Sequence, residues 1–218
     1  MWPNLNHLNK EQDMRLRLIA SAGLVMLVSA ATFAQGGKNS AGQAQGSQAA
    51  PAAQAAQGPF STYDKFAYGR IKTLLVASAE KMPDESYNFK PTDSVRSYGQ
   101  IIGHLADAQY NFCAIALGEK SPGLKIEETK KTKAELVAAL KEAVSYCDKA
   151  YDTMTDASAA EMVPLFGTQM PRFGALNVNN IHNMEHYGNL VTYMRMKNIV
   201  PPSTEQAQAQ AAQQKKKD

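Results

Sequence analysis

Three histidines carry the strongest chemical signal between residues 60 and 202 of this sequence: His104, His182 and His186. His182 and His186 are four residues apart, so on an α-helix they lie one turn apart and about 40° apart around the axis. Two imidazoles with this spacing can reach one metal ion from the same side. His104 can add a third ligand from another helix, and three histidines leave coordination positions open, as in catalytic metal sites.

The three histidines also have a purely structural interpretation. A single histidine at the edge of an apolar helix face, such as His104, is commonly a half-exposed polar residue. The later pair is harder to explain in this way, because Asn189 and Tyr193 continue the same line and form a polar strip along an apolar face. The nearest candidates for hydrogen bonds to the ligands, or for proton transfer, are Asp107, Asn111, Glu185 and Tyr193.

Four amphipathic stretches can position these histidines, and each has the pattern of a helix. We predict helices over Ser61–Lys81, from Thr92-Asp93 to Gly118, from Thr132 to about Met154, and from about Phe173 to Lys197. Thr132 and Glu135 form a capping box, whereas Pro83 and Gly118 are helix-ending residues. Val163–Pro171 contains two prolines and a glycine and predicts a loop. A four-helix bundle buries the apolar faces of such helices, so the predicted fold class is all-α.

Residues 14–34 have the pattern of a secretory signal peptide. Basic residues start the segment, an apolar run spans Leu18–Val28, and small residues favour cleavage after Ala34. The run is shorter than the roughly 20 residues that cross a bilayer. We therefore expect an exported protein, periplasmic or secreted, without stable membrane insertion. Residues 1–13 precede the signal, and no function is predicted for them. Together with the signal they make up residues 1–34.

The segments on either side of the bundle are compositionally simple. In Gln35–Pro59, 19 of 25 residues are Ala, Gly or Gln, which predicts a flexible linker. Ser203–Asp218 is similar and predicts a disordered tail, which leaves residues 60–202 as the domain. That domain holds 16 Lys/Arg and 16 Asp/Glu, so the net charge of +3 belongs to the flanks. A neutral domain without a basic face argues against a nucleic-acid partner.

The chain contains two cysteines, Cys113 and Cys147, on the second and third predicted helices. Export places them in an oxidising compartment, where a disulfide closing a loop of about 35 residues can form if those helices are neighbours. Free cysteine is also among the most buried residue types. No other spacing signal supports a bridge, so the sequence favours two buried, unpaired thiols.

Two of the helical segments resemble the DinB-like family of metal-dependent enzymes. Tyr98–Ala108, with the sequence YGQIIGHLADA, is similar to the family's second helix, and Asn180–Arg195, which begins NIHNMEHYGNL, is similar to its last helix. The similarity covers most of residues 60–200. It implies a four-helix bundle that holds a divalent metal through one histidine of the second helix and two of the fourth. These positions match His104, His182 and His186.

The resemblance also implies a class of function. Some members of the family are thiol-dependent transferases or isomerases, so we expect a metal-dependent transferase or hydrolase that acts on a small molecule. Zinc, nickel and iron are the candidate ions. Asn189 stands where many relatives carry glutamine, and export separates this chain from cytosolic thiols. A non-catalytic metal- or ligand-binding helical module is the alternative function. The sequence leaves the oligomeric state open, with a homodimer as one candidate.

Overall fold

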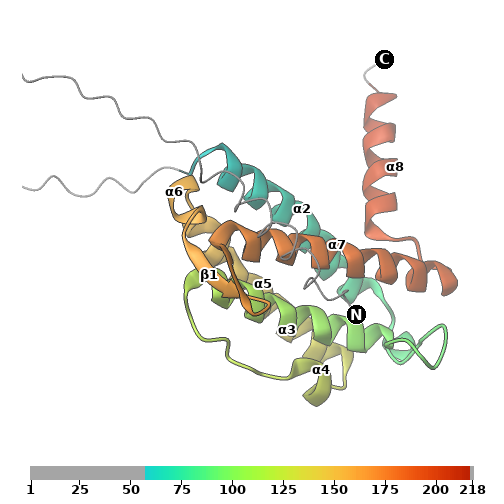
Figure 1. Cartoon of the computed structure of the whole chain (residues 1–218). Helices are drawn as coiled ribbons and strands as arrows, with labels where there is room; N and C mark the ends of the chain where they lie inside the picture. The colour runs from blue at the N-terminus through green and yellow to red at the C-terminus, as the bar shows by residue number, and fades with distance from the viewer. Residues whose placement is uncertain (1–56, 217–218) are drawn as a thin grey trace, which may run out of the picture. The chain divides into compact units, whose positions relative to one another are not determined.

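The structure is a computed structural model and describes residues 57–216 (Figure 1). The predicted signal peptide and residues 35–56 of the predicted linker lie outside this range. In chain order the elements are α2 (Pro59–Lys81), the 3-10 helix η2 (Asp84–Ser86), α3 (Tyr98–Leu117), α4 (Ile126–Thr129), α5 (Lys133–Thr153), α6 (Asp156–Ala159), β1 (Met162–Leu165), β2 (Thr168–Pro171), α7 (Arg172–Met196) and α8 (Pro202–Gln214).

The four long helices α2, α3, α5 and α7 form a bundle (Figure 1). Helix α3 packs against α5 and α7, and α2 packs against the same two helices. Their apolar faces meet in one core, whose fully buried members include Leu75, Ile102, Leu105, Leu140, Leu176 and Leu190. The predicted all-α four-helix bundle is confirmed. Within residues 57–216, none of the helices combines the length and hydropathy that crossing a membrane requires.

Local hydrogen bonds explain where two of the bundle helices begin. Helix α5 starts at the predicted capping box, in which the Glu135 backbone N–H donates to Thr132 Oγ1 at 3.2 Å. The predicted start of α3 at Thr92-Asp93 is wrong. Another capping box, formed by Ser97 and Gln100, starts α3 at Tyr98, where Gln100 Oε1 accepts from the Ser97 N–H at 2.8 Å.

The predicted loop Val163–Pro171 is instead part of a short antiparallel hairpin. Strands β1 and β2 pair with Met162 opposite Pro171 and Leu165 opposite Thr168. In β1, Val163 and Leu165 are buried whereas Met162 is exposed. This alternation of buried and exposed side chains over four residues outweighs the turn signals of proline and glycine.

The domain begins slightly before the predicted boundary at residue 60. Helix α2 starts at Pro59, and the Gln57 side-chain amide donates to the Tyr151 carbonyl oxygen at 2.8 Å. The Asp156 carboxylate accepts from the Ser61 backbone N–H at 2.8 Å, which satisfies one of the unpaired donors at the start of α2. The last residues of the predicted linker are therefore bound to the bundle.

The segment after residue 202 is helical rather than a disordered tail up to Gln214. The Ser203 backbone N–H donates to the Tyr187 hydroxyl at 3.0 Å, and Lys81 forms an ion pair with Glu205. Alanine and glutamine have high helix propensity, so the composition that predicted disorder also suits an exposed helix. Only Pro202 of α8 is buried, so the helix adds little to the core.

Cys113 and Cys147 are joined by a disulfide, which overturns the interpretation as two free thiols. Their Cα atoms are 5.2 Å apart, within the usual range for a bridge. Both residues are fully buried between α3 and α5, which pack as neighbours. The sequence alone did not reveal this adjacency of helices.

Candidate metal centre

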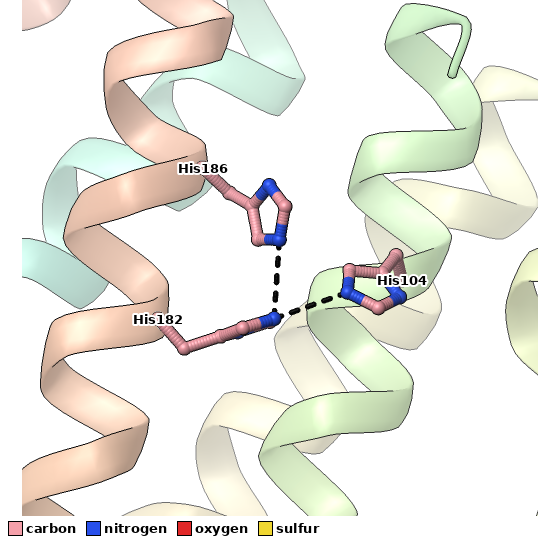
Figure 2. A group of neighbouring side chains, drawn as sticks. All are labelled: His104, His182 and His186. Carbon is pink, nitrogen blue, oxygen red and sulfur yellow. Dashed lines mark hydrogen bonds between the residues drawn. The ribbon is translucent and has the colours of Figure 1, made fainter. Parts of the chain in front are cut away.

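The three predicted histidines converge at the interface of α3 and α7. Figure 2 shows His104 from α3 and His182 and His186 from α7 with their rings directed toward one another. His182 Nε2 lies 3.0 Å from His104 Nε2 and 3.1 Å from His186 Nε2. One ring nitrogen from each residue falls within 4.8 Å of the other two. Helix phase places His182 and His186 together, and the packing of α3 against α7 adds His104.

This geometry fits a small divalent ion. Bonds of about 2.0–2.1 Å to one ion separate the ligand nitrogens by roughly 3.0–3.4 Å in tetrahedral or octahedral geometry. The two nitrogen separations that involve His182 are at the lower end of that range. Each neutral imidazole directs a nitrogen lone pair at the centre. A cation there would bind the three lone pairs, which otherwise repel one another.

Glu127 of α4 sets the orientation of His104. Its Oε2 lies 3.1 Å from His104 Nδ1, and its Oε1 accepts from Arg96 Nε at 2.8 Å. A carboxylate is an acceptor, so Nδ1 of His104 carries the proton and Nε2 keeps its lone pair for the centre. Glu127 is 23 residues from His104, and no sequence pattern links the two.

A glycine and an aspartate of α3 hold Glu127 in place. A Cβ on Gly103 would lie 2.7 Å from Glu127 Cα, so only glycine allows α4 to approach this closely. The two carboxylate oxygens of Asp107 accept the backbone N–H groups of Ile126 at 2.8 Å and Glu127 at 3.0 Å. Gly103, in the middle of a helix, was the available sequence signal, since such a glycine marks a close backbone approach. It does not say which segment approaches.

The two histidines of α7 have different surroundings. His186 is 8% exposed, and its Nδ1 lies 3.3 Å from the Asn189 side-chain amide. If that amide is turned so that its oxygen faces the ring, it accepts from Nδ1–H and leaves Nε2 as the ligand atom. His182 Nδ1 is buried, and no partner for it is found within residues 57–216. His182 is therefore fixed mainly by its place between the other two rings.

All three histidines are held in their neutral form near pH 7. Burial, followed by the neighbouring His186 and His104, lowers the pKa of His182 to about 3. Burial and then Arg96 lower the pKa of His104, although Glu127 opposes this shift. Burial and then His104 lower the pKa of His186. Neutral imidazole is the form that binds metals, so protons compete little with an ion here.

The four polar residues predicted to assist the histidines, Asp107, Asn111, Glu185 and Tyr193, differ in what they contact. Asp107 positions the backbone of α4, as described above. The Tyr193 hydroxyl donates to the Arg96 carbonyl oxygen at 2.9 Å and so supports the residue that binds Glu127. Asn111 accepts a hydrogen bond from the Ser121 hydroxyl. Glu185 is exposed on α7, and within residues 57–216 no hydrogen bond joins it to the histidines.

Two cavities adjoin the centre. A cavity of about 340 Å³ includes His104 and His182 in its wall and extends toward the β1–β2 hairpin. A larger one, of about 630 Å³, lies between α3 and residues 121–131 and contains Glu127 and Asp107 but none of the three histidines. Of these two cavities, the smaller one has two of the three histidines in its wall.

Comparison with known families and structures agrees with this architecture. Residues 67–190 match the model of the DinB superfamily. A crystal structure of a DinB-like protein from Bacillus subtilis is similar, with 18% sequence identity, a TM-score of 0.52, and coverage of 62% of this chain and 92% of that one. A DinB-like protein from Bacillus cereus is similar with 16% identity, a TM-score of 0.54, and coverage of 66% and 93%.

A conserved protein from Enterococcus faecalis is also similar, with 14% identity, a TM-score of 0.50, and coverage of 62% of this chain and 95% of that one. At these identities the three structures establish the fold alone. Among curated proteins, no sequence that matches this chain is found.

Proposed function

Since the chain belongs to the DinB superfamily, we propose that it is an exported protein that binds a divalent metal ion through His104, His182 and His186 and acts as a metal-dependent transferase or hydrolase. The observation that carries the proposal is the convergence of three imidazole nitrogens from α3 and α7 (Figure 2). Three protein ligands leave room at the ion for a substrate atom, which is the arrangement of catalytic rather than structural sites.

The protein side of the proposal is an arrangement of fixed hydrogen bonds. A bound divalent ion would supply a Lewis acid that polarises a substrate oxygen or lowers the pKa of an attached water or thiol. Glu127 holds the proton at Nδ1 of His104 and keeps the ring in position. Arg96 compensates the charge of Glu127 at 2.8 Å, and Asp107 fixes the α4 backbone.

Export is the part of the proposal that rests on two independent features. The first is the signal-peptide pattern of residues 14–34. The second is the buried Cys113–Cys147 disulfide, because disulfides persist mainly in secreted and periplasmic proteins. Both point to an oxidising compartment, where zinc, nickel and iron remain the candidate ions.

One observation favours a non-catalytic binding module as the second candidate. Both carboxylates beside the histidines are already engaged: Asp107 accepts two backbone N–H groups, and Glu127 accepts from Arg96 and lies against His104. A general base needs a free acceptor within reach of the substrate proton. If neither carboxylate is released, catalysis depends on the ion alone.

Metal analysis of the purified chain tests the proposed site. Elemental analysis after dialysis should find about one divalent ion per chain in the wild type and none in His186→Ala. Met184→Ala is the matched control, because Met184 is exposed on the same helix two residues away. Equal metal content in wild type and His186→Ala, with both folded by circular dichroism, would contradict the proposal.

Catalysis needs a test of its own. Hydrolysis of 4-nitrophenyl acetate by the metal-loaded chain, lost in His186→Ala and retained in Met184→Ala, would support the hydrolase type. Full metal loading without any hydrolysis would exclude this type for simple esters. In that case the binding module would be favoured over the hydrolase.

A further inference from the structure

The smaller cavity beside the histidines is apolar over most of its wall. His104 and His182 form one end, and Asp107 and Asn111 contribute the polar edge. The remaining wall comes from α3 and the β1–β2 hairpin and consists of Ala108, Phe112, Ile115, Leu165 and Phe166. Its volume of about 340 Å³ is at the low end of ligand pockets, which span about 300–1,000 Å³. It suits a ligand of about one ring rather than a peptide.

Phe166 has an unusual conformation at the mouth of this cavity. It and Gly167 form the two-residue turn between β1 and β2, with φ angles of 52° and 77°. Positive φ at both turn positions is normally met by Asn-Gly, Asp-Gly or Gly-Gly, and it strains a bulky aromatic residue. Phe166 is also 74% exposed, so burial of its ring in the core does not offset this strain.

The Phe166 ring continues an aromatic row that leads to the histidines. Phe112 meets Phe166 edge to face, with ring centroids 6.1 Å apart. Phe112 meets His182 in the same manner at 5.8 Å. A strained, exposed aromatic residue aligned with the candidate site is the kind of outlier from which a ligand contact can be inferred. The row offers ring faces and edges to a planar group.

We propose that this cavity binds a small anionic ligand carrying a compact aromatic group, with its anionic donor at the histidine centre and its ring against Phe112 and Phe166. This inference rests on the proposed metal site. The three imidazoles are neutral, so they leave the charge of a divalent ion uncompensated, and an anionic ligand would compensate it. The nearby carboxylates do not compete for that position, since Asp107 and Glu127 are held by backbone N–H groups, His104 and Arg96. Asn111 accepts from Ser121 through its carbonyl oxygen, which leaves its NH₂ group as a donor to the ligand.

Two hydroxamates of equal donor chemistry test the proposal. Benzohydroxamate carries a phenyl ring, whereas acetohydroxamate carries a methyl group in its place. Each is titrated into the purified full-length chain loaded with Co²⁺, and binding is followed by the visible absorption of the cobalt. We expect benzohydroxamate to bind about 10-fold more tightly than acetohydroxamate, because only its ring reaches the aromatic row.

The variant Phe166→Asn separates a ligand contact from a structural role. Asparagine suits a positive φ, so its melting temperature should equal or exceed that of the wild type. The variant should bind Co²⁺ fully and acetohydroxamate within twofold of the wild type, yet the preference for benzohydroxamate should fall about fivefold. Phe66→Asn is the matched control: Phe66 is also exposed, at 59%, lies outside the cavity wall on α2, and should leave the preference unchanged.

The outcomes distinguish the two proposals. Failure of the chain to bind Co²⁺ overturns the proposed metal site and the ligand inference with it. Cobalt binding without a preference for the phenyl ring, or with the same preference in Phe166→Asn as in the wild type, overturns only the ligand inference. A lower melting temperature for Phe166→Asn would mean that the phenylalanine stabilises the hairpin, and it too would contradict the inference.

Discussion

Helix α7 carries two groups of polar side chains on adjacent faces, and they differ in what their polar atoms meet. His182 and His186 point with His104 at a common centre next to a cavity. Asn179 lies fully inside the bundle, where its amide donates to Gln109 Oε1 at 2.9 Å and to the Tyr151 hydroxyl at 3.2 Å. The amide of Asn179 also lies within 3.9 Å of both disulfide sulfurs.

The difference shows what separates a binding site from a structural polar cluster in this fold. In the asparagine cluster, the Asn179 amide donor faces two acceptors, and these bonds connect α7 to α3 and α5, although Asn179 Oδ1 and Gln109 Nε2 have no partner within residues 57–216. In the histidine cluster, three ring nitrogens face one another, and a single metal cation can bind all three. The two carboxylates beside the histidines, Asp107 and Glu127, serve the histidine cluster by orienting it rather than by placing charge at its centre.

The largest effects are expected from one variant in each cluster: the histidine variant should lose metal binding, and the asparagine variant should lose stability. His182→Gln should weaken metal binding by more than about 100-fold, since loss of an outer hydrogen-bond partner alone costs about 10–100-fold. It should change the unfolding free energy of the metal-free chain little, because His182 Nδ1 is already buried without a partner among the described residues. Isothermal titration with Zn²⁺ and urea unfolding measure the two quantities.

Asn179→Ala should behave in the opposite way. It leaves Gln109 Oε1 and the Tyr151 hydroxyl without their buried donor, at a cost of roughly 2–3 kcal/mol in unfolding free energy. Zinc affinity should stay within about threefold of the wild type. If Asn179→Ala loses zinc as strongly as His182→Gln, the two clusters are one coupled unit and the contrast between them fails.

The disulfide should affect stability alone and leave the metal site unchanged. The bridge joins residues 34 apart in sequence, and a loop of that size is worth about 3–4 kcal/mol in the chain-entropy model. The unfolding free energy of the double variant Cys113→Ala/Cys147→Ala should therefore be lower by this amount, as measured by urea unfolding. Its zinc affinity should be unchanged. A reducing agent should destabilise the wild type but not the double variant, which serves as the control.

Some of these features were predictable from sequence because they depend on local signals. The capping box of Thr132 and Glu135 marks the start of α5, and the four-residue spacing of His182 and His186 places them on one helix face. The match at His104 came from the resemblance to the family. Each of these signals lies within a few residues of the feature that it predicts.

The parts that sequence did not predict depend on which segments become neighbours. The contact of Glu127 with His104 requires α4 to fold against α3, and the Cys113–Cys147 bridge requires α3 and α5 to be adjacent. Composition was equally ambiguous for α8, because an Ala- and Gln-rich segment suits both an exposed helix and a disordered tail. The hairpin turn at Phe166 also lacks the usual Asn-Gly or Asp-Gly signal.

A smaller effect is expected at Glu127, which tests whether it orients His104. Glu127→Ala should weaken zinc binding by about 10–100-fold, because the His104 ring loses its fixed tautomer and position. Glu127→Gln keeps an acceptor for Nδ1–H and should recover part of that loss. Glu128→Gln, a change at the exposed neighbour that forms an ion pair with Lys125, should bind zinc as the wild type does. Equal affinities for all three variants would remove Glu127 from the site.

The smallest effect concerns Asp64, which connects α2 to the asparagine face of α7. Its carboxylate is buried and accepts from the Asn180 side-chain amide at 2.8 Å. Burial raises the pKa of Asp64 to about 6, although the bond from Asn180 opposes the shift. The folded chain therefore binds a proton at pH 4–6 that the unfolded chain, with an ordinary carboxyl pKa of about 3.9, has largely released.

The sign of the pH dependence follows from this difference in bound protons. Because the folded state holds the additional proton, the Asp64 contribution favours folding at pH 4 and is lost as the pH rises to about 6. Asp64→Asn keeps the shape and the acceptor for Asn180 but cannot ionise. Relative to the wild type it should gain about 1 kcal/mol between pH 4 and pH 7, less than the full shift implies because solvent screens part of the charge. In thermal unfolding of the metal-free chain this amounts to about 2–4 °C. Parallel pH profiles for the two proteins would show that Asp64 is ionised in both states, and that Asp64 and Asn180 form an ordinary charged hydrogen bond.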